Sequence, residues 1–403
     1  MCRLLPTIAM VFCTMSVACH VFAQDPVSIG VLLPLSGPLQ DEGTMNLRGH
    51  QFAAEEINDF GGIQSLNSAA IRLLIADTRG DPARARNETI RLIEEGVVAL
   101  VGAYQSVTTF TATEIAEQYH VPFLISTALA DILTERGHKY TFRTEPSQSQ
   151  FVLAQFQFLR ESGFDHSTRI VLLYENTLWG QSTAKVQRDV AKAKGYTNVG
   201  DIAYPYQLKN LSLTAMHIAK QIRRVMPDVI LHSSYLHDSV KLARSFKKVG
   251  VRPKAIIGTG AGSKDPEFAN SLGRDAQNWM VVNEWSGDMQ RAGTQRLNER
   301  FRRRFGEDMN GIAAVSYVGI WILKEAIEKC ASTDGETLRT ALATLHVHGG
   351  PATILPMGRV IFDAKGNNAA MPIITQIQHG KQRTVWPREL ASVRPVFSRY
   401  FSE

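Results

Sequence analysis

Two polar segments that directly follow predicted buried strands could bind an anion. The apolar run 98–101 predicts a strand, and Ser106 follows it at the start of a helix predicted over 107–119. The run 122–125 predicts a second strand, which ends at Ser126, Thr127, Ala128 and Leu129. Unpaired amides, a hydroxyl group and the positive end of a helix dipole favour an anion at such a place, although capping of its own helix would also explain Ser106. Because ligands of open α/β sheets bind beyond the carboxyl ends of the strands, the two segments predict a carboxylate cradle.

Motifs for catalysis, nucleotide binding and metal binding are not recognised in the chain. The eleven histidines form no H-E-x-x-H motif, and C-x-x-C, G-x-S-x-G and Walker A motifs are missing as well. The Gly-rich segment 258–264 predicts a tight turn, the segment 232–238 lacks enough ligands for zinc, and His346 with His348 is typical of a loop. The arginines of 300–304 indicate a solvated helix face. The sequence therefore predicts a protein that is not an enzyme and uses neither metal nor cofactor.

The elements that must position the cradle follow a regular alternation. Buried strands are predicted at 27–33, 71–76, 98–101, 122–125, 169–174, 198–203, 228–231 and 255–258. Helices are predicted between them, and the alternation restarts at Pro146 after an extended segment, 140–146, that crosses between two units. Helices at 292–305 and 311–329 and strands near 358–362 and 371–377 complete the chain. This alternation predicts parallel sheets wrapped by helices.

Length, composition and charge agree with a folded two-domain protein. The chain has 403 residues, of which 44% are hydrophobic and 20% charged, and its net charge is +6. Since this charge is spread along the chain, nucleic acid is not expected as a partner. Residues 1–23 predict a secretory signal that is cleaved after Ala23, with a lipoprotein at Cys19 as the weaker alternative. We therefore expect an exported, periplasmic protein in which Cys330 is the one remaining cysteine.

Several motifs, in this order, resemble the periplasmic solute-binding proteins of branched-chain amino acid ABC transporters. They cover nearly all of the mature chain and comprise 29–38, 58–63, Asp77 before Asp81-Pro82, 100–106, 121–126, Phe142-Arg143 and 358–366. The resemblance implies the type I periplasmic-binding fold, an α/β fold of two doubly wound parallel-sheet lobes joined by three hinge crossovers. It implies a first lobe of 24–143 plus about 285–345 and a second lobe of 144–284 plus about 346–403, with a ligand trapped between them.

The resemblance also implies which residues contact the ligand. Ser106 matches the serine that binds the ligand carboxylate, and Thr127 and Leu129 match positions that contact the head group. Trp179 and Tyr235 match aromatic residues that close over the ligand from the second lobe. Further candidates are the neighbours of these positions and a residue where the family often has a tyrosine, namely Tyr104, Gln105, Ala128 and Glu42. Tyr174 and Trp285 are aromatic residues that could also wall the pocket, although core packing explains any one of them.

Two positions depart from the family pattern. Leu129 stands where the family has a threonine. The family's acidic residue that pairs with the ligand ammonium should fall near Gly260, and residues 260–262 offer no acid. A buried ammonium without a counter-charge costs several kcal/mol. Glu42, Asp131 or Glu284 could supply that charge from another direction. If none does, a carboxylate or amide without an ammonium, such as an aromatic acid, fits the cleft better.

The sequence thus predicts a monomeric, exported solute-binding protein. It would capture a small amino acid or organic acid in the interlobe cleft and deliver it to an inner-membrane ABC permease. A ligand-sensing clamp that signals to a receptor or regulator is the nearest alternative. An exported α/β hydrolase is a remote one, because no arrangement of nucleophile, base and orienting group is recognised.

Overall fold

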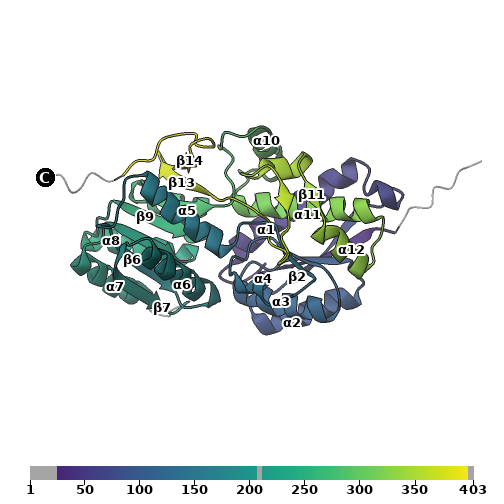
Figure 1. The fold of residues 1–403 in the computed structure, drawn as a ribbon, viewed down its shortest axis with the longest axis horizontal. Helices are drawn as coiled ribbons and strands as arrows, with labels where there is room; N and C mark the ends of the chain where they lie inside the picture. Colours follow the sequence, from purple (N-terminus) through teal and green to yellow (C-terminus); the bar gives the residue numbers. More distant parts are fainter. Residues whose placement is uncertain (1–24, 207–210, 398–403) are drawn as a thin grey trace, which may run out of the picture.

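The computed structural model describes residues 25–206 and 211–397, which form two lobes, each built on its own β-sheet (Figure 1). The predicted signal segment 1–23, with Cys2, Cys13 and Cys19, lies outside these ranges. Crossing a membrane takes a long apolar helix, and none is found within the described ranges. Cys330, at the end of a helix, is a free thiol.

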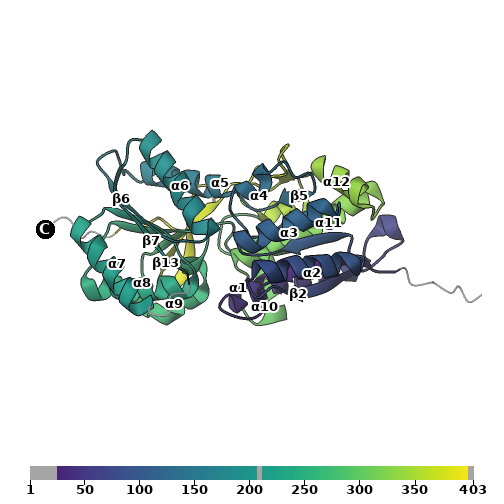
Figure 2. The same cartoon turned by 90° about the horizontal axis from the view of Figure 1, so that it is seen from below.

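The first sheet is parallel throughout and has the strand order β2-β1-β3-β4-β5. Its strands are β1 (Val27–Leu33), β2 (Ile71–Asp77), β3 (Ala99–Gly102), β4 (Phe123–Ile125) and β5 (Thr141–Arg143). The helices of this region are α1 (Gln40–Asp59), α2 (Pro82–Glu94), α3 (Ser106–Gln118) and α4 (Ile132–Glu135), with the 3₁₀ turn η1 (Gln64–Leu66). Helices α2 and α3 lie side by side on one face of the sheet (Figure 2).

All seven residues of β1 are buried because both faces of the sheet are covered. Ile29 and Val31 belong to the hydrophobic core that includes Phe52 of α1. Leu32 points to the other face, where it belongs to a core with Leu92 of α2. Successive side chains of β1 alternate between two buried faces. Apolar residues are therefore favoured along the whole strand and not only at every second position.

The second sheet has the order β14-β13-β10-β9-β8-β6-β7. Its strands are β6 (Arg169–Glu175), β7 (Thr197–Tyr204), β8 (Val229–Ser233), β9 (Ala255–Thr259), β10 (Met280–Asn283), β13 (Ile373–Gln378) and β14 (Lys381–Trp386). Strands β6 to β10 are parallel, whereas β13 runs antiparallel to both β10 and β14. The surrounding helices are α5 (Gln148–Glu161), α6 (Leu178–Ala193), α7 (Leu211–Val225), α8 (Leu236–Val249) and α9 (Pro266–Leu272), with the 3₁₀ turns η2 (Gly262–Lys264) and η3 (Gly273–Ala276).

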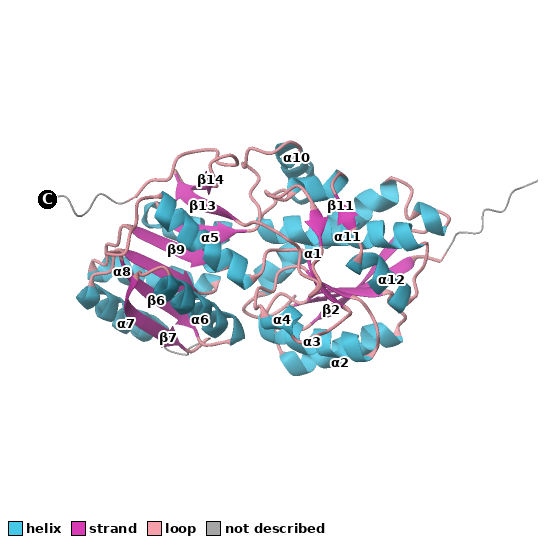
Figure 3. Cartoon of the chain, viewed as in Figure 1, coloured by secondary structure: helices cyan, strands magenta, loops and turns pink. Residues whose placement is uncertain are grey.

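The remaining elements follow β10 and mostly cover the first sheet. They are α10 (Thr294–Phe305), α11 (Gly311–Cys330), α12 (Gly335–Ala343), η4 (Gly350–Ile354) and a small sheet of β11 (His346–Val347) and β12 (Val360–Ile361). Helix α11 packs along α1, and Phe301 of α10 contacts Phe52 with ring centroids 5.6 Å apart. Figure 3 shows each sheet enclosed by helices.

The predicted α/β class with parallel sheets is confirmed, together with two predicted helix starts. Asp81 accepts the amide of Arg84 at the start of α2, and Ser147 and Gln150 form the capping box of α5. The segment predicted to cross between units, 140–146, contains β5, and strands β10 and β14 were not predicted. The sequence reasoning read β5 as part of an extended crossing segment and assigned no strand to the residues of β10 and β14.

The chain passes between the two sheets three times, at 144–147, 284–293 and about 369–372. We propose that these passages are the hinge and that the predicted lobe boundaries hold up to residue 345. Asn367 bridges to Arg143, and the ring of Phe362 lies 5.2 Å from that of Phe142. These contacts favour placing 346–368 with the first lobe as well.

Candidate ligand site between the two lobes

A small cavity of about 20 Å³ lies where the two lobes meet. Five of its wall residues follow strands of the first sheet: Tyr104, Ser106, Thr127, Leu129 and Glu145. Five follow strands of the second sheet: Trp179, Tyr235, Gly260, Ala261 and Lys264. A cavity of this size has room for little more than one water molecule, and residues of both lobes meet around it.

Seven of the ten residues predicted from the sequence line this cavity, namely Tyr104, Ser106, Thr127, Leu129, Trp179, Tyr235 and Gly260. The carboxyl ends of β3, β4, β6, β8 and β9 bring them together. That is the edge at which parallel α/β sheets bind ligands.

The other three predicted residues lie next to the cavity and not in its wall. Gln105 is buried beside Tyr235 of the second lobe. Ala128 is buried in the core of the first lobe. Glu42, in the first turn of α1, is buried, and this burial raises the pKa of its carboxyl to about 8. At neutral pH a carboxyl with that pKa is mostly protonated.

Ser106 is the first residue of α3, and its hydroxyl links two strand ends. Its Oγ accepts the backbone amide of Ala130 at 3.3 Å. The N-cap position is Gln105, and no side chain caps the helix there. Helix capping therefore does not explain Ser106, and its O–H remains available as a donor beside the first amides of α3, which have no acceptor within the helix.

Thr127 presents a hydrogen-bond acceptor to the cavity, whereas Ser106 presents a donor. Its hydroxyl donates to Oδ1 of Asn46 at 3.1 Å, and the amide of Asn46 in turn donates to the carbonyl of Glu42 at 2.9 Å. Because its proton is engaged, the Thr127 oxygen offers lone pairs to the cavity and acts as an acceptor. The first lobe thus presents a donor, Ser106, and an acceptor, Thr127, to the same small space.

Aromatic rings close the cavity from the second lobe. The ring of Tyr235 lies 5.0 Å from that of Trp179 and 6.3 Å from that of Tyr104, which belongs to the first lobe. The indole Nε1 of Trp179 is buried and has no hydrogen-bond partner. The other two aromatic candidates are not in the cavity wall: Tyr174 interacts with Asp201 and Arg188, and Trp285 is fully buried in the core.

Two charged residues of the cavity wall were missed by the sequence reasoning. Glu145 lies in the first crossover and is only 1% exposed, and burial together with Glu284 raises the pKa of its carboxyl well above the usual value. Lys264 ends η2, and its Nζ lies 2.7 Å from Oε1 of Glu284, which is also buried. The Gly-rich segment 258–264 therefore does more than turn the chain, because it brings a cation to the cavity.

The residues considered as substitutes for the missing acid have other partners. Glu284 is paired with Lys264, and Asp131 accepts both the amide and the hydroxyl of Ser149. Glu145, which the sequence reasoning did not consider, is the acid that faces the cavity. The one signal for it was its place between Arg143, a residue of a family motif, and Pro146.

Other candidates from the sequence carry no site. No group of three potential metal ligands occurs in the described part of the chain. His232 is buried against Trp279, with the ring centroids 5.4 Å apart, and His346 lies in β11, contrary to the predicted loop. The predicted solvated face of α10 is ion-paired, since Arg300 and Arg304 contact Glu56 and Glu55.

Comparison with known proteins assigns the chain to a family. Residues 26–381 match the model of a family described as periplasmic binding protein. The chain belongs to this family. The resemblance inferred from the motifs is thereby confirmed.

Curated relatives extend over nearly the whole chain. Leu/Ile/Val-binding protein homolog 7 of Brucella abortus is 27% identical over 381 residues, which cover 91% of this chain and 92% of the relative. Homolog 8 of the same species is 28% identical over 388 residues, which cover 93% of each chain.

Solved structures of the same fold bind different ligands. The substrate-binding protein LivJ of Streptococcus pneumoniae, in complex with isoleucine, has a TM-score of 0.78 and 22% identity, covering 90% of this chain and 100% of that one. A solute-binding protein of R. palustris in complex with benzoate has a TM-score of 0.77 and 18% identity, covering 92% and 98%. The predicted type I periplasmic-binding fold is confirmed, and the two ligands share a carboxylate.

Proposed function

We propose that this periplasmic binding protein captures a small carboxylate-bearing solute in the interlobe cavity and delivers it to an ABC permease. The names of the curated relatives and the ligands of the solved structures, isoleucine and benzoate, support this class of solute. Export with cleavage after Ala23, action as a monomer and the lack of catalytic activity belong to the same proposal.

One observation carries the proposal: a free hydroxyl donor at a helix N-terminus faces a buried cavity that both lobes enclose. Ser106 is 3% exposed and lies beside the first amides of α3. A carboxylate placed there would receive the Ser106 hydroxyl and backbone amides and would lie at the positive end of the helix dipole.

The closed arrangement suggests the working cycle. A ligand would dock on the first lobe at Ser106 and Thr127 while the lobes are apart, and the second lobe would then close with Trp179 and Tyr235. The contact between the rings of Tyr104 and Tyr235 exists only across the closed interface. A ligand that contacts both lobes shifts the population toward the closed form, which the permease would recognise.

A thermal-shift screen of the mature protein, freed of carried-over ligand by partial unfolding and dialysis, tests the proposal. A ligand at about one hundred times its Kd stabilises by about 2.7 kcal/mol, which a melt resolves. Amino acids, aromatic carboxylates, short dicarboxylates and uncharged amides form the panel. We expect at least one carboxylate-bearing compound, and no uncharged amide, to raise the melting temperature.

Substitution of Ser106 locates the site. Ser106→Ala should weaken the binding of the active compound by about tenfold or more, because a donor to a charged group is lost. Ser245→Ala, a matched change at a buried position of α8 outside the cavity, should leave binding unchanged. A panel without any active carboxylate, or equal affinities in both variants, would contradict the proposal.

A further inference from the structure

Glu145 is a buried carboxyl group whose position the carboxylate cradle does not explain. Its side chain is 1% exposed and lines the cavity, and its Oε1 has no hydrogen-bond partner. A buried polar atom without a partner is costly, so an acceptor that faces a ligand cavity indicates a donor on the ligand.

The cations that face Glu145 have other partners as well. The guanidinium of Arg143, on β5, donates to the carbonyls of Leu129 and Ala130 at 3.1 and 2.6 Å. Lys264, on η2, is paired at 2.7 Å with Glu284, which follows β10 and repels Glu145. Neither cation hydrogen-bonds to Oε1 of Glu145, and burial together with Glu284 raises the pKa of its carboxyl although Lys264 and Arg143 oppose this.

The hydrogen-bonding groups of the cavity form two sets. Ser106 and the first amides of α3 are donors and suit an anion, as argued above. Thr127, whose proton is engaged with Asn46, and Glu145 are acceptors and suit a cationic nitrogen. Because both sets line one cavity, the two ligand groups must lie close together, as they do in an α-amino acid.

We propose that Glu145, at the hinge, binds a cationic nitrogen of the ligand and gives up its proton to solvent as that nitrogen arrives. The inference rests on the proposed function and adds a charge-specific contact. Glu145 thereby pairs with the ligand ammonium, a role for which an acid near Gly260 was expected. One proton leaves Glu145 for each zwitterion bound, and the resulting carboxylate pairs with the ligand ammonium.

Proton release separates this contact from simple carboxylate binding. Below the pKa of Glu145, the affinity for an amino acid should rise by up to about tenfold per pH unit, since binding and deprotonation are linked. A carboxylic acid without nitrogen leaves the Glu145 proton in place, and its affinity should not rise with pH.

The experiment compares amino acids with the acids that lack only the amino group. The probes are L-leucine with 4-methylpentanoate, L-phenylalanine with 3-phenylpropanoate and L-glutamate with glutarate. Titration calorimetry at pH 6 in two buffers of different ionisation enthalpy gives the protons released by the mature protein. We expect close to one proton for the amino acid of the binding pair, and weaker binding without release for its partner acid.

Substitutions at Glu145 test the assignment. Glu145→Gln should abolish proton release and weaken the binding of the amino acid by more than about tenfold, because the ammonium loses its counter-charge. Glu145→Asp keeps the carboxyl but shortens the side chain, so it should retain proton release. This variant separates the effect of the charge from the effect of packing. Glu56→Gln, a matched change in a separate groove of the first lobe, should alter neither quantity.

The outcomes distinguish failure of the role of Glu145 from failure of the proposed function. If an acid binds as well as its amino acid, releases no proton and depends on Ser106, the proposed function stands and the role of Glu145 is refuted. Amino-acid binding that is unchanged in Glu145→Gln refutes it too. If no amino acid, aromatic acid or dicarboxylate binds, the proposed function fails and this inference fails with it.

Discussion

A β-carbon on Gly260 would lie 2.7 Å from Cδ1 of Leu129, which approaches it from the other lobe. The two positions at which the resemblance implies a departure therefore face each other across the cavity. Gly260 has a φ of 80°, a conformation that suits glycine, and Phe151 would lie 3.3 Å from the same β-carbon. Leu129 occupies the space that a side chain at 260 would need, so each position limits the side chain that the other can carry.

This contact predicts the effect of a side chain at position 260. Gly260→Ala should destabilise the protein by about 1–3 kcal/mol, because it forces a left-handed backbone and meets Leu129. Leu129→Ala removes the atom that it meets, so the double variant should lose less stability than the two single losses combined. Urea unfolding of the four proteins in this cycle measures the coupling. Losses that add within about 0.5 kcal/mol would show that the two positions do not interact.

A second prediction concerns the ion pair between Lys264 and Glu284. Lys264→Met should cost about 3–5 kcal/mol, because it leaves Glu284 buried without its partner. The double variant Lys264→Met with Glu284→Leu should recover most of that loss, since buried ion pairs exchange for apolar pairs at little net cost. Urea unfolding at pH 7 measures both. Lys185→Met, which breaks an exposed pair with Asp189, is the control and should change stability by less than about 1 kcal/mol.

The cradle was predictable from the sequence because its parts are local. Ser106 and Thr127 each directly follow a buried strand, and parallel strands bring such ends to one edge of the sheet. The closing aromatic residues, Trp179 and Tyr235, came from the resemblance, because nothing local fixes how one lobe meets the other.

The acid and the cation of the cavity were not predictable for the same reason. Glu145 lies on a crossover and Lys264 on a 3₁₀ turn that are 119 positions apart, so no spacing pattern links them. Their convergence depends on how three crossovers place the second lobe. The segment 140–146 was read as an extended crossing, which hid the strand β5 and placed Glu145 in a linker and not in a wall.

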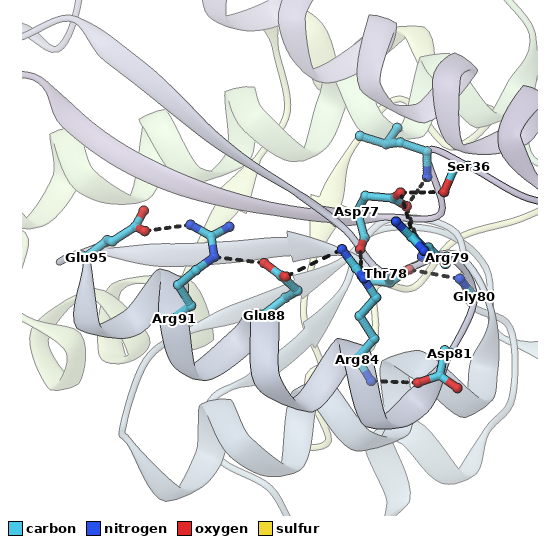
Figure 4. Close-up of polar contacts among 11 residues, drawn as sticks. Ser36, Asp77, Thr78, Arg79, Gly80, Asp81, Arg84, Glu88, Arg91 and Glu95 are labelled. Atoms are coloured by element: carbon cyan, nitrogen blue, oxygen red, sulfur yellow. Dashed lines mark hydrogen bonds and ion pairs between the residues drawn. The ribbon is translucent and has the colours of Figure 1, made fainter.

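A third prediction concerns the loops at the end of the first sheet, where Asp77 joins the segments that follow β1 and β2 (Figure 4). Its carboxylate accepts the Leu35 amide at 2.8 Å, the Ser36 hydroxyl at 2.5 Å and the Arg79 amide at 2.9 Å. Burial opposes ionisation of Asp77, but the hydrogen bonds from Ser36 and the neighbouring amides outweigh it and lower its pKa.

Asp77→Asn should therefore destabilise the protein by about 1–3 kcal/mol at pH 7, because charge-assisted hydrogen bonds are lost. Since the folded-state pKa lies below the unfolded value of 3.8, the contribution of Asp77 is present above pH 3.8 and is lost as the pH falls through the folded-state pKa. Denaturant unfolding at pH 7 and pH 3 measures this. The wild type and Asp77→Asn should approach each other at pH 3, and a constant difference would contradict the role of the charge.

The last prediction uses the buried carboxyl of Glu42, whose pKa burial raises from 4.5 to about 8. The folded state prefers the protonated form, so the stability due to Glu42 is full below pH 4.5 and is lost as the pH rises through 8. Glu42→Gln is neutral at every pH and escapes this loss. Relative to the wild type, the variant should gain stability between pH 5 and pH 9, on the order of 4 kcal/mol.

Urea unfolding of both proteins at pH 5, 7 and 9 measures this gain. Asp41→Asn, a matched change at the exposed neighbour in the same helical turn, should follow the pH dependence of the wild type. A difference between wild type and Glu42→Gln that stays constant with pH would mean that the carboxyl is ionised throughout. Glu42 would then be a standing negative charge beside Tyr104, able to compete with Glu145 for the ligand nitrogen.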